Sequence, residues 1–347
     1  MEIHPKFKLN GESYSVQELK EVAYSLVKEG KPFEVSIGNF LLNWLSTSKT
    51  LTVSTSGSTG TAKQIQLQKT QMVNSALATG SLFNLKAGNS ALLCLPCNFI
   101  AGKMMLVRAM VLGLEMDSVE PSSNPLREVI KTYDFGAMIP LQAQNSLKKL
   151  QLIDKLILGG TPLNQKLRNQ LSPLNTSIYE TYGMTETITH IAVRKLEADK
   201  FVTLPDVTVV QDSRECLVIN APKILTEEVI TNDVVELISN TEFKWLGRYD
   251  TVINSGGIKL IPEQIELKLS KIIDNRFFVA GIPDETLGEK LVLVVESSEI
   301  STLAEKLKFV EGLSKFELPK AIYFIPEFKE TKNGKLHRSK TMKLIKN

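Results

Sequence analysis

The sequence predicts an α/β protein with a large N-terminal domain, built on a doubly wound, mainly parallel sheet plus a small β subdomain, and a small α+β C-terminal domain. Between residues 90 and 180, short apolar runs of strand length alternate with helical patterns, which is typical of a doubly wound sheet. Residues 201–246 change to alternating β-rich segments. Gly247-Arg248-Tyr249-Asp250 interrupts that run, so we expect domains at residues 1–248 and 249–347.

The first 49 residues form a short lead-in. Residues 16–27 have apolar side chains at helical spacing, with Ser15 as the expected N-cap, and residues 40–45 indicate a second short helix. The β-prone runs 50–53 and 64–67 then flank a loop of small residues, which predicts two strands joined by that loop.

The loop at residues 54–63 consists of serines, threonines, two glycines, an alanine and Lys63. Glycines let a ligand approach the backbone closely, and hydroxyl and backbone N–H groups suit phosphate oxygens. The loop lacks the Gly-Lys-[Ser/Thr] of a Walker A sequence, so phosphate would be held by another architecture. A solvated polar hairpin is the alternative.

The middle of the chain supplies the alternation that predicts the parallel sheet. We expect helices at 70–83 (capped at Thr70), 101–110, 141–150 and 164–171, and strands at 90–96, 135–140, 155–160 and 177–180. Ligands of such sheets bind beyond the carboxyl ends of the strands. Gly159-Gly160 and the segment 182–187 both follow strands, which places them for ligand contact.

The helix at 101–110 is apolar except for Lys103 and Arg108. Two cations in such a helix need water, a carboxylate or an anionic ligand. The alternative is that their stems are buried and their charged ends lie in solvent.

The rest of the chain has two patterns of predicted elements. Short strands at 207–210, 215–219 and 234–238 predict a small antiparallel subdomain. After residue 248 we expect helices at 262–272 and 301–310 and strands at 277–281, 291–295 and 321–325.

The amino-acid composition limits the classes of partner that the chain is expected to bind. The chain has 347 residues, 43% hydrophobic and 23% charged, and a formal net charge of +3. That balance disfavours nucleic acid or a membrane as the main partner. An apolar run long enough to span a bilayer and an apolar signal-peptide core are both missing from the sequence, which predicts a cytoplasmic location. The oligomeric state stays open, a homodimer included.

The three cysteines, Cys94, Cys97 and Cys216, are too few for a disulfide framework. Cys94 and Cys97 have Cys-x-x-Cys spacing, but no second pair of ligands accompanies them. Buried structural cysteines are the favoured interpretation, and a redox or metal pair is the alternative.

Six segments follow one another in an order and at distances that are far more specific than each alone. They are 55–63, Gly159-Gly160, Tyr182-Gly183-Met184-Thr185-Glu186-Thr187, Thr231-Asn232-Asp233, Gly247-Arg248-Tyr249-Asp250 and Asn333-Gly334-Lys335-Leu336-His337-Arg338. From about residue 50 to its end, the chain resembles the adenylate-forming superfamily of acyl- and aryl-CoA synthetases, peptide-synthetase adenylation domains and luciferases. The resemblance implies ATP, Mg²⁺ and coenzyme A as substrates and cofactor. A carboxylate would attack the α-phosphorus of ATP, and a thiol would then displace AMP.

The resemblance also implies roles in nucleotide binding. The loop would hold pyrophosphate, the Tyr182 ring would face adenine, and Asp233 and Arg248 would contact the ribose. The implied nucleotide-binding residues are Thr55, Ser56, Gly57, Ser58, Thr59, Gly60, Lys63, Gly159, Gly160, Tyr182, Gly183, Asp233 and Arg248. Asn232 departs from the commoner Thr-Gly-Asp but leaves the aspartate in register.

Three residues are implied in catalysis. Thr185 would hydrogen-bond the α-phosphate, and Glu186 would ligate Mg²⁺, which favours one or two carboxylates plus phosphate oxygens. Lys335 would bridge the reacting carboxylate and the α-phosphate and neutralise developing charge. The alternatives are a surface carboxylate for Glu186 and a basic tail for Lys335.

The resemblance further implies that the C-terminal domain is mobile. Asp250 matches the hinge about which it rotates between the half-reactions, and a plain turn residue is the alternative. Gly256 and Gly257 would line the pantetheine channel of coenzyme A.

Residues 98–105 and 183–192 resemble the short o-succinylbenzoate–CoA ligases of menaquinone biosynthesis. Phe99 stands where the family has an aromatic or histidine gate at the acyl pocket. The implied substrate has an aromatic ring and two carboxylates, so the pocket needs donors for the carboxylate that does not react. Lys103, Arg108, Thr189 and His190 are the candidates, with a structural role as the alternative for His190.

Other functions stay open at this point. A different aryl- or acyl-CoA synthetase, or a stand-alone adenylation domain that loads a carrier protein, would share the nucleotide motifs. A non-catalytic nucleotide-binding regulator is disfavoured by the intact Glu186, Asp233 and Lys335. The short lead-in leaves the shape of the acyl pocket open.

Overall fold

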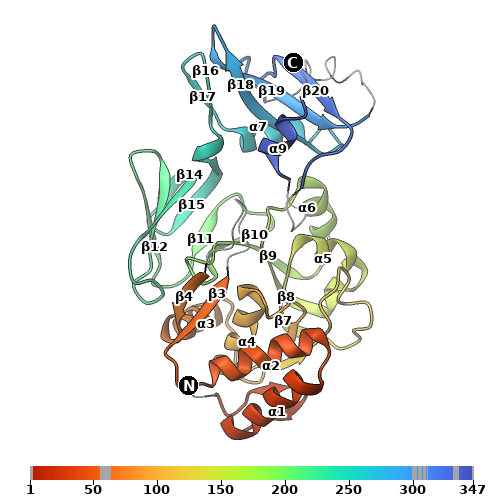
Figure 1. The fold of residues 1–347 in the computed structure, drawn as a ribbon, viewed down its shortest axis with the longest axis vertical. Coiled ribbons are helices and arrows are strands. Elements are labelled where there is room, and N and C mark those ends of the chain that lie inside the picture. Colours follow the sequence, from red (N-terminus) through yellow and green to blue (C-terminus); the bar gives the residue numbers. More distant parts are fainter. Residues whose placement is uncertain are drawn as a thin grey trace. The chain divides into compact units, whose positions relative to one another are not determined.

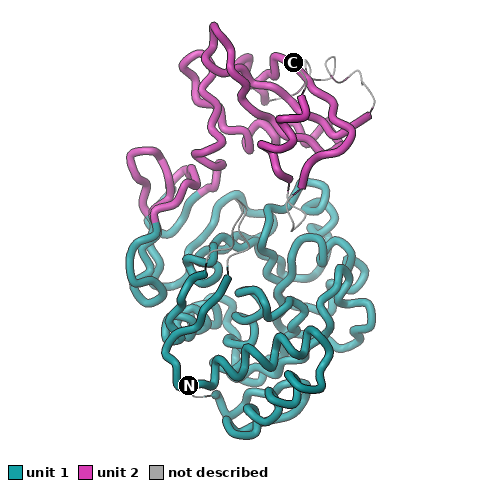
Figure 2. Tube along the Cα trace, viewed as in Figure 1, with its two compact units in different colours: residues 1–209, 219–229, 238–243 teal, residues 210–218, 230–237, 244–347 magenta. Residues whose placement is uncertain are grey.

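A computed structural model describes residues 3–54, 64–298, 303, 307, 310, 312–330 and 336–345. The chain divides into two compact units, coloured separately in Figure 2. Unit 1 comprises residues 1–209, 219–229 and 238–243, and unit 2 comprises residues 210–218, 230–237 and 244–347. The predicted boundary at residue 248, with a C-terminal domain that moves, stays a prediction.

A mainly parallel sheet forms the centre of unit 1 (Figure 1). Its parallel strands, in spatial order, are β1 (Lys8–Leu9), β6 (Glu115–Ser118), β5 (Ser90–Leu93), β7 (Tyr133–Met138), β8 (Ile153–Leu158) and β9 (Ser177–Gly183). Three antiparallel strands extend it: β2 (Glu12–Ser13) beyond β1, and β10 (His190–Lys195) and β11 (Phe201–Thr203) beyond β9. The mixed α/β fold with its mainly parallel sheet is therefore confirmed.

The helices of unit 1 follow the predicted alternation. They are α1 (Val16–Glu29), α2 (Pro32–Trp44), α3 (Lys69–Leu82), α4 (Ile100–Leu112), α5 (Pro140–Asn145), the 3-10 helix η1 (Leu147–Leu152) and α6 (Gln165–Leu171). Ser15 caps α1 in a capping box with Glu18, as serine at this position predicts. Asn164 caps α6 by accepting a hydrogen bond from the Leu167 N–H at 2.8 Å.

The two strands predicted around the small-residue loop are β3 (Thr50–Ser54) and β4 (Gln64–Gln68). They pair antiparallel in register from Thr50–Gln68 to Ser54–Gln64. The hairpin is thus confirmed, while residues 55–63 lie outside the described residues.

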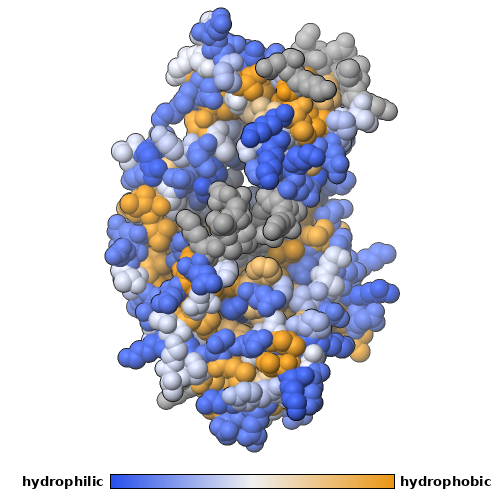
Figure 3. Space-filling view, viewed as in Figure 1, coloured by the Kyte–Doolittle hydropathy of each residue, from blue (hydrophilic) through white to orange (hydrophobic). Residues whose placement is uncertain are grey.

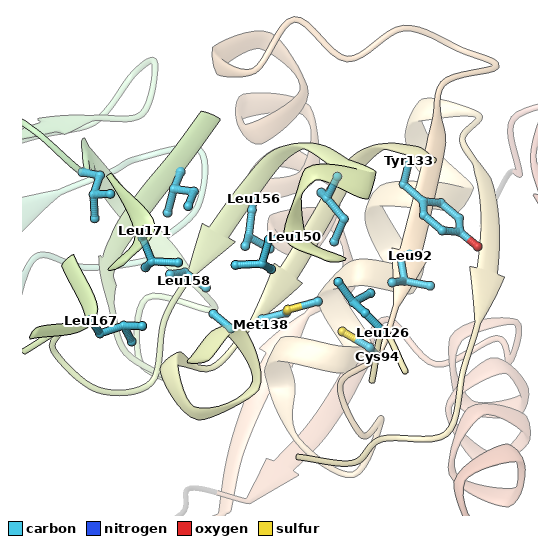
Figure 4. Packing of buried hydrophobic residues seen from close by; sticks show 14 of the residues in the cluster. Leu92, Cys94, Leu126, Tyr133, Met138, Leu150, Leu156, Leu158, Leu167 and Leu171 are labelled. Carbon is cyan, nitrogen blue, oxygen red and sulfur yellow. The ribbon is translucent and has the colours of Figure 1, made fainter. Parts of the chain in front are cut away.

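A leucine-rich core holds the parallel strands to the helices that follow them (Figure 4). Leu92 of β5, Met138 of β7 and Leu158 of β8 belong to one buried cluster with Leu167 and Leu171 of α6. Side chains of this size stabilise by roughly 1.5–3 kcal/mol each when fully buried. This core fixes the strands whose carboxyl ends carry most of the predicted site of unit 1.

Unit 2 is an α+β unit. Its elements after residue 248 are the 3-10 helix η2 (Tyr249–Thr251), β16 (Ile253–Ser255), β17 (Ile258–Leu260), α7 (Pro262–Leu269), β18 (Phe277–Asp284), β19 (Gly288–Glu296), β20 (Ala321–Ile325) and α9 (Arg338–Met342). The strand order is β17-β16-β19-β18, and β20 pairs parallel with β19. Four further strands have residues in both units: β12 (Thr208–Gln211), β13 (Cys216–Asn220), β14 (Val229–Ser239) and β15 (Glu242–Arg248).

Several helix predictions were wrong in detail. The short helix expected at 40–45 is the C-terminal part of α2, and the helix expected at 262–272 ends at Leu269. Thr70 does not cap α3, which begins one residue earlier, because the buried Lys69 donates to the Asn43 and Trp44 carbonyls at 2.7 and 2.8 Å. The helix expected at 141–150 is divided at Ser146 into α5 and η1. The deviations at Thr70 and Ser146 come from tertiary contacts or turns that the apolar spacing does not encode.

On the face of unit 1 visible in Figure 3, hydrophilic residues are interspersed with small groups of hydrophobic ones. None of the helices among the described residues combines the length and apolarity needed to cross a bilayer. Cys94, Cys97 and Cys216 are buried and free, and burial raises the pKa of both Cys94 and Cys97 to about 12. They are the structural cysteines that the sequence favoured.

Candidate active site

The predicted site of unit 1 lies where the order of the parallel strands reverses. After β5 the chain adds β6 on one side and β7 on the other, so the switch point is between β5 and β7. The segments beyond the carboxyl ends of β5, β7, β8 and β9 begin at Cys94, Ile139, Gly159 and Met184. Because parallel strands end at one edge, these segments share that edge, where ligands of open α/β sheets bind.

The predicted glycines are required by their surroundings. A Cβ atom on Gly159 would overlap Thr181 Oγ1, and one on Gly183 would overlap the backbone of Thr189 and His190. Gly160 has φ +91°, a conformation that L side chains rarely adopt. The turn after β8 and the end of β9 therefore depend on glycine before any ligand is considered.

A hydrogen-bonded turn at residues 184–189 contains Thr185 and Glu186. Thr187 is fully buried, and its hydroxyl accepts from the Met184 N–H at 2.9 Å and lies 2.8 Å from the Thr189 carbonyl. Ile188 is buried with φ +66°, which is rare for a β-branched residue and indicates a strained backbone. The turn leaves the Glu186 side chain exposed.

Sequence reasoning missed both residues that hold this turn. A threonine following the motif's glutamate gave a weak signal for Thr187, since hydroxyls often bond nearby backbone. Nothing in the sequence signals the left-handed conformation of Ile188.

The carboxylate of Glu186 also has the chemistry expected of a magnesium ligand. Groups of three or more His, Cys, Asp or Glu that could hold a metal are absent from the described residues. Mg²⁺ usually keeps several waters and takes one or two carboxylates plus phosphate oxygens, so a single exposed carboxylate fits it.

The Tyr182 ring is oriented by an aromatic cluster. Its centroid lies 5.8 Å from that of Phe201 and 5.3 Å from that of Phe243, in a T-shaped arrangement with the latter. The Arg194 guanidinium lies 4.7 Å from the Phe201 ring centroid, and Arg194 in turn pairs with the buried Glu180. Sequence reasoning named Tyr182 but not the residues that fix its ring.

Three of the predicted acyl-site residues come together around the buried Arg108. Its Nη2 atom lies 3.3 Å from Thr189 Oγ1 and 3.4 Å from His190 Nδ1. Its side chain is 1% exposed, and its Nε atom has no hydrogen-bond partner. Within the part of the chain that the structure describes, no carboxylate pairs with it.

The charge state of this cluster follows from the donors. Arginine only donates, so His190 Nδ1 accepts from Arg108, and Nε2 carries the proton toward Thr79 Oγ1 at 3.4 Å. Burial, together with Arg108, holds the pKa of His190 well below its ordinary value, which keeps the ring neutral. Burial lowers the pKa of Arg108 to about 10, so Arg108 stays charged at neutral pH.

Lys103 is not part of this cluster. Its ammonium donates to the carbonyls of Cys97 and Asn98 at 2.6 and 3.0 Å, and burial lowers its pKa. It thereby holds the loop that leads into Phe99, the N-cap residue of α4, whose side chain is 50% exposed. The two cations of α4 thus have different surroundings, and neither keeps its charged end simply in solvent.

Unit 2 brings together the residues predicted to contact ribose. Asp233 is 6% exposed and accepts from Trp245 Nε1 at 3.0 Å, while Arg248 Nη1 lies 3.6 Å from the same carboxylate oxygen. Arg248 Nε also donates to Asp250 Oδ1 at 3.0 Å. Trp245 was not predicted, although an indole N–H beside a buried carboxylate is a common way to satisfy both groups.

The unusual Asn232 has a partner of its own. Its Oδ1 accepts from Arg214 Nη1 at 3.0 Å, and the Arg214 guanidinium lies 5.3 Å from the Tyr249 ring centroid. The departure from Thr-Gly-Asp therefore connects two of the predicted motifs within unit 2.

The remaining predicted residues are placed as follows. Gly256 and Gly257, with φ +58° and +82°, form the turn between β16 and β17. The predicted phosphate-loop residues Thr55, Ser56, Gly57, Ser58, Thr59, Gly60 and Lys63, together with Lys335, lie outside the described residues.

A hollow of about 480 Å³ lies at the opposite, amino edge of the parallel strands of unit 1. Ser90, Asp134 and Ile153 line it, and Ser90 and Asp134 hydrogen-bond each other. It contains none of the predicted site residues, so the carboxyl edge remains the candidate site.

Comparison with known proteins agrees with these motifs. The family model described as "AMP-binding enzyme" matches residues 51–223. The chain is 26% identical to the 2-succinylbenzoate–CoA ligase of Bacillus cytotoxicus over 335 residues, covering 84% of this chain and 69% of the relative. The Staphylococcus epidermidis enzyme of the same name is also 26% identical, over 82% of this chain and 68% of its own length.

Two solved structures are similar. An acyl-CoA synthetase (AMP-forming)/AMP-acid ligase II-like protein from Dyadobacter fermentans is 36% identical, with a TM-score of 0.64 and coverage of 94% of this chain and 98% of that one. The o-succinylbenzoate CoA synthetase of Bacillus subtilis in complex with its acyl-adenylate intermediate has a TM-score of 0.74 at 18% identity, covering 83% and 68% of the two chains, and supports the fold alone. With a relative of this identity and coverage, and with the motifs in their expected order, the chain belongs to the AMP-binding family of adenylate-forming enzymes.

Proposed function

We propose that this acid–CoA ligase activates o-succinylbenzoate. The carboxylate of the acid would attack the α-phosphorus of ATP to give an acyl-adenylate and pyrophosphate, and the thiol of coenzyme A would then displace AMP. The observation that carries the choice of acid is Arg108, a buried cation without a carboxylate partner among the described residues. An unpaired buried charge is costly, so a retained one needs a compensating anion.

The chemistry of the Arg108 cluster suits the carboxylate that does not react. The Thr189 hydroxyl accepts from Arg108 and keeps its own proton to donate to an anion, in a chain of hydrogen bonds that polarise one another. His190 is neutral, so it adds no charge that would make the site too cationic for a single carboxylate. Phe99 and Ile139, two exposed apolar side chains in segments beyond the carboxyl ends of β5 and β7, are candidates for contact with the aromatic ring.

The other residues keep the roles that the family resemblance implies. Thr185 would bond the α-phosphate, Tyr182 would face adenine, and Asp233 and Arg248 would hold the ribose. Glu186 would ligate Mg²⁺, which neutralises phosphate charge when bound. Lys335 would act in the first half-reaction, Asp250 as the hinge, and Gly256 and Gly257 at the pantetheine.

A panel of acids tests the proposal. We expect ATP-dependent pyrophosphate release with o-succinylbenzoate, and formation of the thioester when coenzyme A is added. Release with medium-chain fatty acids or benzoate, and none with o-succinylbenzoate, would contradict the choice of acid. Acyl transfer to a carrier protein but not to free coenzyme A would contradict the choice of acceptor.

A further inference from the structure

A partly buried ion pair in unit 2 joins two segments that are far apart in the sequence. Glu266 of α7 accepts from Arg338 Nη2 at 2.8 Å through one carboxylate oxygen and from the Val279 N–H at 2.9 Å through the other. Arg338 is further held by a contact of 3.4 Å between its Nη1 and the Val279 carbonyl, and its guanidinium lies 5.6 Å from the Phe278 ring centroid. The two terminal nitrogens of the guanidinium therefore have different partners, a carboxylate and a backbone carbonyl.

The surroundings of Glu266 make its charge depend on Arg338. The pKa of Glu266 is raised to about 7, mainly by burial and to a lesser extent by Glu263 one turn earlier on α7, while Arg338 on α9 and the Val279 N–H on β18 oppose the rise. Burial therefore favours the protonated carboxyl, whereas the guanidinium facing it favours the ionised form.

Arg338 begins α9 and follows Lys335 by three residues in the sequence. The described ends of the segment that contains Lys335 are tied together, since Glu330 and Leu336 form an antiparallel bridge and the His337 N–H donates to the Lys329 carbonyl at 2.7 Å. A displacement of Arg338 would consequently be passed to Leu336, the residue next to Lys335.

We propose that Glu266 is a positioning residue for the adenylation half-reaction, which anchors Arg338 and through it the C-terminal end of the segment that carries Lys335. The inference rests on the proposed function, and in particular on the role of Lys335. Misplacement of a reacting group by about 1 Å can cost on the order of 100-fold in rate. Glu266 would thus matter for the step that uses Lys335 and for no other.

The same helix offers a matched control. Lys268 of α7 pairs with Glu317 at 2.6 Å. The side chains of Lys268 and Glu317 are 31% and 17% exposed, and those of Arg338 and Glu266 are 31% and 19% exposed. The Glu317 pair therefore resembles the Glu266 pair in element, length and burial, but it has no connection to the Lys335 segment in the sequence.

The test separates the two half-reactions in the full-length protein. Pyrophosphate release with ATP and the acid reports adenylation, and thioester formation from supplied acyl-adenylate and coenzyme A reports the second step. We expect Glu266→Gln to slow adenylation about 10- to 100-fold and leave thioester formation within about twofold. Glu317→Gln should leave both rates within about twofold.

Three results would overturn the inference: equal losses in both half-reactions for Glu266→Gln, the same adenylation loss for Glu317→Gln, or normal adenylation by Glu266→Gln. Lys335→Ala is measured alongside. If Lys335→Ala slows adenylation while Glu266→Gln does not, the inference alone fails; if Lys335→Ala has no effect, the assigned role of Lys335 fails as well.

A second variant protects the test against misfolding of Glu266→Gln. Arg338→Lys keeps the positive charge but loses the planar fork that contacts Glu266 and Val279. We expect the same selective loss of adenylation, and the double variant should be no slower than the slower single variant, because both changes break one contact. Multiplicative losses in the double variant would contradict the proposed connection.

Discussion

Arg108 in unit 1 and Glu266 in unit 2 are both charged groups withdrawn from water, but their surroundings are opposite. The hydrogen-bond partners of Arg108 among the described residues are neutral, namely Met105, Thr189 and His190. Glu266 has a guanidinium partner and a backbone donor. A buried charge without a counter-ion in the chain can be compensated by an anionic ligand. A buried charge that is paired holds two segments of the chain together. The first therefore indicates substrate recognition, and the second positioning.

Lys335→Ala has the largest expected effect on the rate, and the other variants are compared with it. Removing one preorganised donor at a reacting group typically costs on the order of 10²–10³ in rate. We expect that loss in adenylation, with thioester formation from supplied adenylate nearly intact. Equal loss of both steps, measured in separate half-reaction assays, would refute the assigned role.

Arg108→Met tests the unpaired charge. Methionine fills a similar space without a charge, so the fold should survive and thermal stability should change little. We expect kcat/KM for o-succinylbenzoate to fall about 30- to 100-fold, because an ion pair with the substrate is lost. The control is a benzoate analogue without the second carboxylate, whose slow turnover should be unchanged; a uniform loss with both acids would argue for a purely structural arginine.

Trp245→Phe tests a paired carboxylate, Asp233, which we propose binds the ribose of the nucleotide. The ring is kept, but the 3.0 Å hydrogen bond to Asp233 is removed. A hydrogen bond to a charged group contributes about 1.5–3 kcal/mol, shared here with other contacts, so we expect a rise of about 5- to 10-fold in the KM for ATP with kcat little changed. Titration calorimetry with AMP measures the same loss without turnover, and an unchanged dissociation constant would show that Trp245 does not act through Asp233.

The smallest effect is an opposite pH dependence of the two units. Glu266 has a raised pKa in the folded state. Its contribution to the free energy of unfolding is therefore fully present below about pH 4.5 and is lost as the pH rises through about 7. His190 has a lowered pKa, so unit 1 loses stability as the pH falls below about 6.5. For Glu266 the contribution to the free energy of unfolding is on the order of 3 kcal/mol.

Hydrogen exchange of peptides from α7 and from β10 measures both dependences in one sample. Protection of α7 should decrease from pH 5 to 7.5, after correction for intrinsic exchange, and protection of β10 should increase. Glu266→Gln should flatten the first trend and leave the second. Trends of the same sign in both peptides would contradict the assignments.

The sequence predicted the elements whose signals are local and periodic. The alternation of apolar strands and helices, the β3–β4 hairpin and the Ser15 cap follow from spacing and from short-range hydrogen bonds, which one sequence contains. Thr70 failed as a cap because Lys69 reaches carbonyls at the end of α2, a contact across more than twenty residues. Local propensity does not contain such contacts.

The candidate site shows the same difference between local sequence signals and long-range contacts. Motif order identified Tyr182, Thr185, Glu186, Asp233 and Arg248, and the apolar helix drew attention to Arg108. The residues that hold them, such as Thr187 and Trp245, were missed because their partners lie in other elements or depend on backbone angles, as at Ile188. Prediction from one sequence therefore reached the residues of the proposed site before the residues that orient them.

The chain contains two tryptophans, and the compact units have one each: Trp44 is 1% exposed at the end of α2 in unit 1, and Trp245 is partly exposed on β15 in unit 2. Emission from a buried indole is blue-shifted, while one beside a carboxylate is sensitive to quenching. Replacing either by phenylalanine would leave a single intrinsic fluorophore in a known unit. Unfolding of each half of the molecule could then be followed optically without any added label.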